Sequence, residues 1–462
     1  MKYFLTLITF VILFDSSPIW AQVKDEDALA IQSIYDLALT ESQCYQWLEA
    51  LSSDMPGRLA GSAGANASVE HMRQLMLTIG FDTVYLQKCM APRWERGEKE
   101  VVRITQSPLG SIELNALALG NSIATPEEGL FAEVIELKSI DEVEELGEEN
   151  IKGKIVFFNR PFDPTLINTF SAYGSAVDQR GAGPVKAAEY GAVGVLVRSM
   201  TNSLDDVPHT GNTYFKEGGR NIPAVAISTK DSETLNRALR LGKTSVYMKT
   251  NCKRLGEVET YNVIGEIKGS EKPNEILLVG GHLDSWDVSG GAHDDGAGCV
   301  HALQVIDLLH KMNYIPKRTL RCVLFMNEEN GLAGGKAYWE ESYANKEFHL
   351  AAVESDRGGF TPRGFSVDGH PDVFNDKYRN LNQWLPLLEP YGLTFVKGGS
   401  GADISGLKDQ RGILIGFMPD SQRYFDFHHT PKDNIDAVNK RELELGAAAI
   451  TALIWLLDKY GL

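Results

Sequence analysis

From about Val258 onward, strongly apolar runs alternate with segments whose apolar residues recur at helical spacing. The strand-like runs are VIGEIKG, EILLVGG, TLRCVLFMN, HLAAVES and ILIGFM, and the helix-like segments are AGCVHALQVIDLLHKM, LAGGKAYWEESY and ELELGAAAITALIWLLDKYG. Strands that are apolar throughout are buried on both faces, and crossover helices supply the cover. This region therefore predicts an α/β fold with a mixed, mostly parallel sheet covered by helices on both faces.

The rest of the chain predicts a second, smaller domain. At 462 residues the chain is too long for one ordinary core. After an acidic stretch, residues 120–255 carry short β segments such as KGKIVFF and NIPAVAIS. We interpret them as a small β-rich insert in a larger domain of residues 22–119 and 256–462, in which we expect Ser62 to cap a helix through VEHMRQLMLTIG.

The first residues have the pattern of a secretory signal. Met1 and Lys2 precede the apolar run YFLTLITFVILF, and small and polar residues follow as far as Ala21. A membrane anchor is the alternative, but the run is shorter than the roughly 20 residues that span a bilayer. We expect residues 1–21 to be cleaved and the protein to be exported to the periplasm or the extracellular space, with no membrane attachment afterwards.

Charge and cysteine content exclude some classes of partner and fold. The formal net charge is −17, which disfavours nucleic acid and anionic lipid as partners. The five cysteines show no paired spacing, so no disulfide framework is predicted. Cys299 and Cys322 lie in apolar surroundings and are expected to be core thiols.

Polar clusters follow the apolar strands, where ligands gather in open α/β sheets. EILLVGG leads into HLDSWDVSGGAHDDGAG, which holds His282, Asp284, Asp294 and Asp295 with no Lys or Arg between them. A bound cation would neutralise these carboxylates, and imidazole with carboxylate suits zinc. An H-x-D pair by itself is also typical of an ordinary turn at a strand end.

Three further clusters follow other strands or an aromatic run. Glu328 and Glu329 come directly after TLRCVLFMN, and adjacent carboxylates can divide the roles of metal ligand and general base. They could equally be a solvated helix N-terminus. Asp356 ends HLAAVES, and His429 follows the aromatic run RYFDF.

The series HLDSWD, GAHDDGAG, NEENGLAGG, ESDRGG and HHTPKD resembles the co-catalytic zinc aminopeptidase and carboxypeptidase family. GRLAGS, PRWERGE and VPHTG are similar to motifs of its carboxypeptidase Q branch, and the insert is similar to the protease-associated domain of that branch. The likeness covers nearly all of the chain after residue 21. It implies a zinc exopeptidase fold, two zinc ions and a homodimer.

Position by position, the resemblance implies that His282 and Asp356 hold one zinc ion, Glu329 and His429 the other, and that Asp294 bridges them. It implies Glu328 as the general base acting on a water that bridges the metals. Asp284 matches the residue that orients the first histidine, and the bond from Asp294 to Asp295 matches a peptide that is often cis. Of His428 and His429, the resemblance selects His429, because the ligand directly precedes the Ser or Thr of a turn, here Thr430.

The expected reaction is hydrolysis of dipeptides or short peptides. Asp403, Tyr424 and His209 are the candidates for substrate contacts, His209 because an insert above the metals could exclude long substrates. The alternatives are an aminopeptidase for longer peptides, a single-zinc aminoacyl cyclase, and a receptor-like module without catalysis. The intact ligand series disfavours the last, and the insert disfavours the cyclase.

Overall fold

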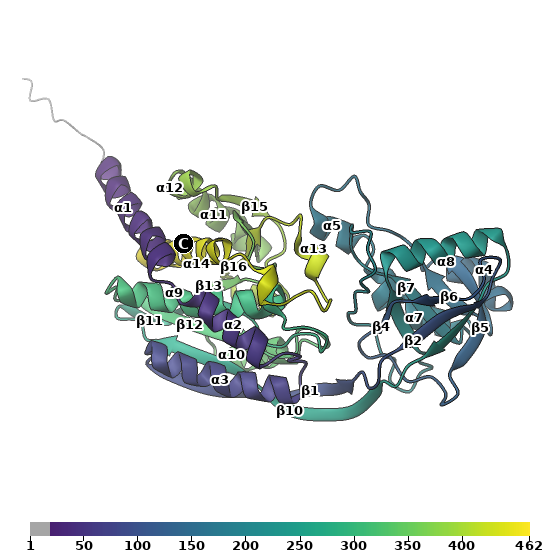
Figure 1. Ribbon diagram of the computed structural model, residues 1–462. Coiled ribbons are helices and arrows are strands. Elements are labelled where there is room, and N and C mark those ends of the chain that lie inside the picture. The colour runs from purple at the N-terminus through teal and green to yellow at the C-terminus, as the bar shows by residue number, and fades with distance from the viewer. Residues whose placement is uncertain (1–18) are drawn as a thin grey trace, which may run out of the picture.

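The computed structural model describes residues 19–462, and its two lobes lie side by side in Figure 1. The large lobe is built on an eight-stranded sheet. In spatial order its strands are β1 (Thr83–Glu95), β10 (Lys253–Ile267), β12 (Arg318–Phe325), β11 (Lys272–His282), β13 (Phe348–Glu354), β16 (Ile413–Pro419), β14 (Pro362–Gly369) and β15 (Thr394–Lys397). Strands β12, β11, β13 and β16 are mutually parallel, so their carboxyl ends share one edge.

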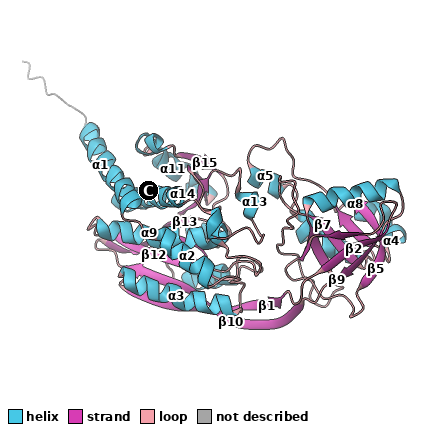
Figure 2. Ribbon diagram, in the orientation of Figure 1, coloured by secondary structure: helices cyan, strands magenta, loops and turns pink. Residues whose placement is uncertain are grey.

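Helices cover both faces of this sheet, as the apolar strands require (Figure 2). In β11, Leu277 and Val279 face a core that includes α9 (Ala297–Lys311) and α14 (Lys440–Tyr460), and Leu278 faces the opposite core with Tyr338 of α10 (Ala333–Ala344). The remaining helices of this lobe are α1 (Ile19–Thr40), α2 (Cys44–Asp54), α3 (Ala63–Ile79), α11 (Pro371–Asn382), α12 (Leu385–Leu388) and α13 (Tyr424–Phe427). The prediction of a mixed α/β sheet covered on both faces is confirmed.

Helix α3 begins where the sequence predicts. The Ser62 side chain accepts a hydrogen bond from the backbone N–H of Ala65 at 3.0 Å and so caps the first turn. The helix ends at Gly80, whose φ of 96° is the left-handed conformation typical of a helix C-terminus. Both ends of this helix are therefore set by local sequence.

The small lobe contains a second eight-stranded sheet. In spatial order its strands are β3 (Ile112–Leu114), β2 (Val101–Gln106), β9 (Ser245–Lys249), β5 (Leu130–Leu137), β6 (Ile155–Phe158), β7 (Gly194–Arg198), β8 (Ala224–Ile227) and β4 (Ala116–Ala118). Its helices are α4 (Glu142–Ile151), α5 (Thr169–Gly174), α6 (Asp178–Gly181), α7 (Gly183–Glu189) and α8 (Thr229–Leu241). The long antiparallel pair β1 and β10 carries the chain between the lobes (Figure 1).

The start of the small lobe differs from the predicted boundary at residue 120. Strands β2, β3 and β4 precede that residue, yet they pair within the second sheet, β2 with β9 and β4 with β8. Short strands carry no signal for the sheet that they join, because pairing with distant strands decides it. The small lobe therefore begins near residue 101 instead of 120.

The predicted signal peptide lies outside the described residues except for positions 19–21, which begin α1. Within residues 19–462, no helix combines the length and the apolarity needed to cross a membrane.

All five cysteines are buried and unpaired, as expected for core thiols. Burial raises the pKa of Cys44, Cys89 and Cys252 to about 12. We predict that a thiol-specific disulfide reagent at pH 8 leaves the native chain unlabelled, because only the thiolate reacts. The chain unfolded in guanidinium chloride should release one chromophore per cysteine, and rapid labelling of the native chain would contradict this burial.

Candidate active site

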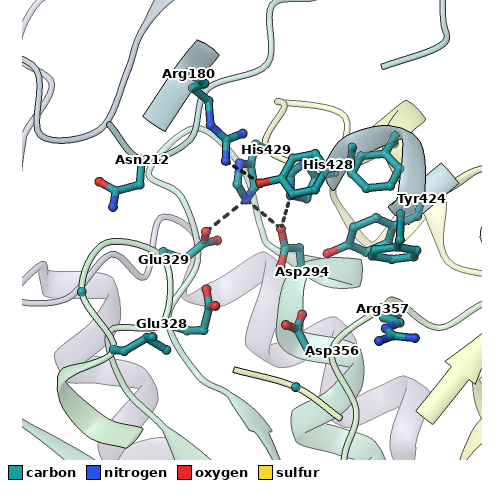
Figure 3. Close-up of a pocket in the computed structure, with 16 residues that line it drawn as sticks. Arg180, Asn212, Asp294, Glu328, Glu329, Asp356, Arg357, Tyr424, His428 and His429 are labelled. Atoms are coloured by element: carbon teal, nitrogen blue, oxygen red, sulfur yellow. Dashed lines mark hydrogen bonds and ion pairs between the residues drawn. The ribbon is translucent and has the colours of Figure 1, made fainter. Parts of the chain in front are cut away.

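Side chains from five segments meet at the carboxyl edge of the parallel strands (Figure 3). His282 is the last residue of β11, Glu329 follows β12, and Asp356 follows β13. Asp294 lies in the π-helical turn Ala292–Gly296 before α9, and His429 follows α13. The peptide bond between Asp294 and Asp295 is cis, as the resemblance implies.

Asp294 lies between the two histidines, with one carboxylate oxygen toward each. Its Oδ1 is 3.3 Å from His282 Nε2, which is also 3.5 Å from Asp356 Oδ1. Its Oδ2 is 3.2 Å from His429 Nε2, which is also 3.1 Å from Glu329 Oε2. The neighbouring His428 Nε2 is farther from Asp294 Oδ2, at 3.8 Å. The arrangement has two halves that share one carboxylate.

The far nitrogen of each imidazole is bonded to a backbone carbonyl. His282 Nδ1 is 3.0 Å from the carbonyl oxygen of Asp284, and His429 Nδ1 is 3.3 Å from that of Thr210. A carbonyl only accepts, so each Nδ1 carries a proton. In a neutral ring the Nε2 lone pair then faces carboxylate oxygens, and this arrangement requires a cation between them.

The buried carboxylates require positive charge. Burial lowers the pKa of His429, but Glu329 and Asp294 outweigh it and raise that pKa to about 9. A second proton on the ring is thus one source of the charge, and a metal ion is the other. Asp294 Oδ2 and Glu329 Oε1 are buried without a hydrogen-bond donor.

Two clusters have ligand atoms close enough to hold a metal ion. Asp294, His428 and His429 form one, and His282, Asp295 and Asp356 form the other, with all ligand atoms of a cluster within 4.8 Å of one another. Imidazole nitrogen with carboxylate oxygen is a donor set that zinc favours. The residues therefore fit a zinc ion on each side of Asp294.

Three other buried carboxylates hold the backbone of the site. Each accepts two backbone N–H groups: Asp284 from Glu328 and Glu329, Asp295 from His282 and Gly298, and Asp433 from His293 and Asp294. Hydrogen bonds to an ionised acceptor are stronger than neutral ones, so they fix the loops firmly. The Asp284 side chain is 3.7 Å from His282 Nδ1, so its main-chain carbonyl orients that ring, contrary to the expected side-chain contact.

A cavity of about 460 Å³ opens above these side chains, between the lobes. Its floor includes Glu328, whose pKa burial raises well above the ordinary value. Figure 3 shows the carboxylates of Glu328, Glu329, Asp294 and Asp356 on the same side of the cavity. The small lobe contributes Phe170, Tyr173, Arg180 and Asn212, and the large lobe adds Arg357, Tyr424 and Phe425.

Of the three expected substrate residues, Tyr424 lines the cavity, and His209 and Asp403 do not. The His209 ring is 1% exposed and bonds through Nδ1 to the His428 carbonyl at 2.8 Å. Asp403 is fully buried behind the site, and burial raises its pKa well above the ordinary value. Arg180 and Arg357 line the cavity but belong to no motif with a known spacing, so the sequence gave no signal for their role.

Two arginines fix the loop of residues 283–291. Arg58, from GRLAGS, is fully buried and donates to the carbonyls of Leu283 and Gly291 at 2.8 and 3.0 Å, and also to those of Gly290 and Leu51. Arg96, from PRWERGE, binds both carboxylate oxygens of Asp287 at 2.8 and 2.7 Å. Arg96 also donates to the Ala118 carbonyl of the small lobe, so it ties the loop to both lobes.

Known proteins are similar over nearly the whole chain. The model of peptidase family M28 matches residues 262–454. Carboxypeptidase Q of Bos taurus is 33% identical over 448 residues, which are 95% of this chain and 90% of the relative. The human carboxypeptidase Q is 32% identical over 449 residues, again 95% of this chain and 90% of the relative.

Two solved structures share the fold. A peptidase M28 precursor from Shewanella amazonensis SB2B has a TM-score of 0.87 and 32% identity, and covers 94% of this chain and 97% of its own. A zinc aminopeptidase from Bacillus subtilis has a TM-score of 0.64 at 22% identity, over 89% of this chain and 94% of its own, which shows the fold alone.

The fold and the cluster of imidazoles and carboxylates define a zinc metallopeptidase. The chain belongs to peptidase family M28, and among the relatives it is similar to carboxypeptidase Q.

We predict that Arg58→Met lowers the free energy of unfolding by about 3 kcal/mol, because buried carbonyls of the 283–291 loop lose a charged donor. Urea denaturation measures the change. The exposed Arg237 is the control, and Arg237→Met should leave stability within about 0.5 kcal/mol. Equal stability of the two variants would contradict a role for Arg58 in holding the loop.

Proposed function

We propose that the chain is an exported exopeptidase with two zinc ions that hydrolyses dipeptides or short peptides. One observation carries the proposal: a buried Asp294 carboxylate lies 3.3 and 3.2 Å from the Nε2 atoms of His282 and His429, one on each side. His282 and Asp356 would hold one ion, Glu329 and His429 the other, and Asp294 both. Export rests on the N-terminal signal pattern.

Two zinc ions bound there would polarise the scissile carbonyl and lower the pKa of a nearby water. Glu328 is adjacent to the proposed ligand Glu329 but faces the cavity. Its carboxylate takes the proton of the attacking water and delivers it to the leaving amine. Asp284 positions Glu328, because its Oδ1 accepts the Glu328 backbone N–H at 3.0 Å.

The cavity supports short substrates with a free carboxyl terminus. Aromatic side chains of both lobes enclose it, and about 460 Å³ is room for a small ligand. Arg180 is 4% exposed, and its Nε is buried without an acceptor. Two of its other N–H groups reach Tyr173 Oη and the Thr210 carbonyl, so this guanidinium has donors left for a substrate carboxylate.

We expect Glu328→Gln to lower kcat by about 10²–10⁴-fold, because the amide cannot accept the proton of water. Zinc content, measured by atomic emission, should stay near two per chain. The control is Glu340→Gln at an exposed position. A Glu328→Gln variant with full turnover would contradict the assignment of the base.

A second prediction concerns the carboxyl end of the substrate. Arg180→Met should lower kcat/KM for a dipeptide about 10–100-fold, because a charge-assisted hydrogen bond is lost. The same dipeptide with a C-terminal amide is the matched control and should lose little. Equal losses on both substrates would exclude carboxylate recognition by Arg180. Equally fast cleavage of long peptides from their amino ends would favour an aminopeptidase.

A further inference from the structure

The loop of residues 207–213, VPHTGNT, belongs to the small lobe but contacts the backbone of the histidine pair. The His209 N–H donates to Ser199 Oγ at 2.8 Å, and Thr210 Oγ1 donates to the Ala118 carbonyl at 2.7 Å. Gly120 N–H donates to the Gly211 carbonyl at 3.0 Å. The loop is therefore fixed to the small lobe before it reaches the large one.

Three hydrogen bonds join this loop to His428 and His429. His209 Nδ1 donates to the His428 carbonyl at 2.8 Å, and the Thr210 N–H donates to the His429 carbonyl at 3.0 Å. In return, His429 Nδ1 donates to the Thr210 carbonyl at 3.3 Å. Two main-chain carbonyls and one ring of the histidine pair are thus held by a loop of the other lobe.

The backbone of His429 needs this support. Its φ is 61°, in the left-handed region, where a residue with a Cβ is less stable by roughly 1–2 kcal/mol. The hydrogen bonds to the carbonyls of His428 and His429 compensate for that cost. The contact from His429 Nδ1 also keeps the proton on Nδ1, so the Nε2 lone pair faces Glu329 and Asp294.

The two histidines differ in the source of this orientation. His282 Nδ1 bonds to the carbonyl of Asp284, two residues along the same loop. His429 Nδ1 bonds to a carbonyl of the small lobe. The half of the site around His282 is therefore complete within the large lobe, and the half around His429 is not.

We propose that the loop of His209, Thr210 and Gly211 positions His429, so that the affinity of the metal site of Glu329 and His429 depends on contact with the small lobe. This inference rests on the proposed function, because it takes His429 as a metal ligand. His209 is a positioning residue, since its ring is buried outside the cavity.

The matched variants are His209→Leu and His209→Asn. Leucine removes the donor to the His428 carbonyl, and the asparagine amide nitrogen can replace Nδ1. Other contacts between the lobes remain in both, including the ion pair of Lys432 with Asp205 at 2.7 Å. Circular dichroism and thermal unfolding check that each variant folds.

Equilibrium dialysis of the full chain against buffered zinc, with atomic emission, measures both affinities. In His209→Leu we expect one Kd to rise about 10–100-fold and the other to stay unchanged, with recovery in His209→Asn. Turnover of a dipeptide by His209→Leu should recover at saturating zinc, which a merely misfolded variant would not do. Wild-type affinity for both ions in folded His209→Leu would overturn the proposal.

A second pair of variants decides the matter if His209→Leu does not fold. A Cβ at Gly211 would lie 2.7 Å from His429 Nδ1 and 2.4 Å from Arg180 Cζ, so Gly211→Ala should weaken the same site. Gly218 also has positive φ, with no atom within 4 Å of its Cβ position, so Gly218→Ala is the control. Equal zinc affinities in these two variants would overturn the proposal.

His429→Ala separates this inference from the proposed function. Loss of one zinc ion in His429→Ala, with none of the expected effects at positions 209 and 211, refutes only the role of the loop. Retention of two ions in His429→Ala refutes the ligand assignment on which the inference rests.

Discussion

The whole site depends on the buried carboxylate of Asp294, which lies between two imidazoles. Burying ionised carboxylates without compensating charge is costly, and Asp294 Oδ2 and Glu329 Oε1 have no hydrogen-bond donor. Their cost is offset only if cations occupy the space that these side chains surround. The stability of this region and its chemistry are therefore coupled, because the charge that neutralises the cluster is also the charge that activates a substrate.

The sheet makes this concentration of charge possible. Parallel strands end at one edge, so β11, β12 and β13 deliver His282, Glu329 and Asp356 to one place. Anchoring carboxylates then fix the loops beyond the strands through pairs of backbone N–H groups. The metal-facing side chains thus project from rigid supports, which is the geometry that metal affinity and catalysis require.

The small lobe completes the site in two ways. It adds aromatic side chains and Arg180 to the cavity wall, and its loop at His209 contacts the backbone of His428 and His429. Arg96 connects the same lobe to Asp287, in the loop after β11, so the lobes are joined on both sides of the metal-facing residues. Asp287, for which the sequence suggested no role, belongs to this connection.

The sequence by itself determined the α/β class, the helix cap at Ser62 and the strand-end clusters, because periodicity and capping are local. Family likeness singled out Asp294 and His429. Tertiary structure alone decided which sheet took β2, β3 and β4, and that Arg180 reaches the cavity. It also turned His209 away from the cavity, toward the His428 carbonyl. These outcomes depend on contacts between residues far apart in the chain, for which a single sequence carries no periodic or local signal.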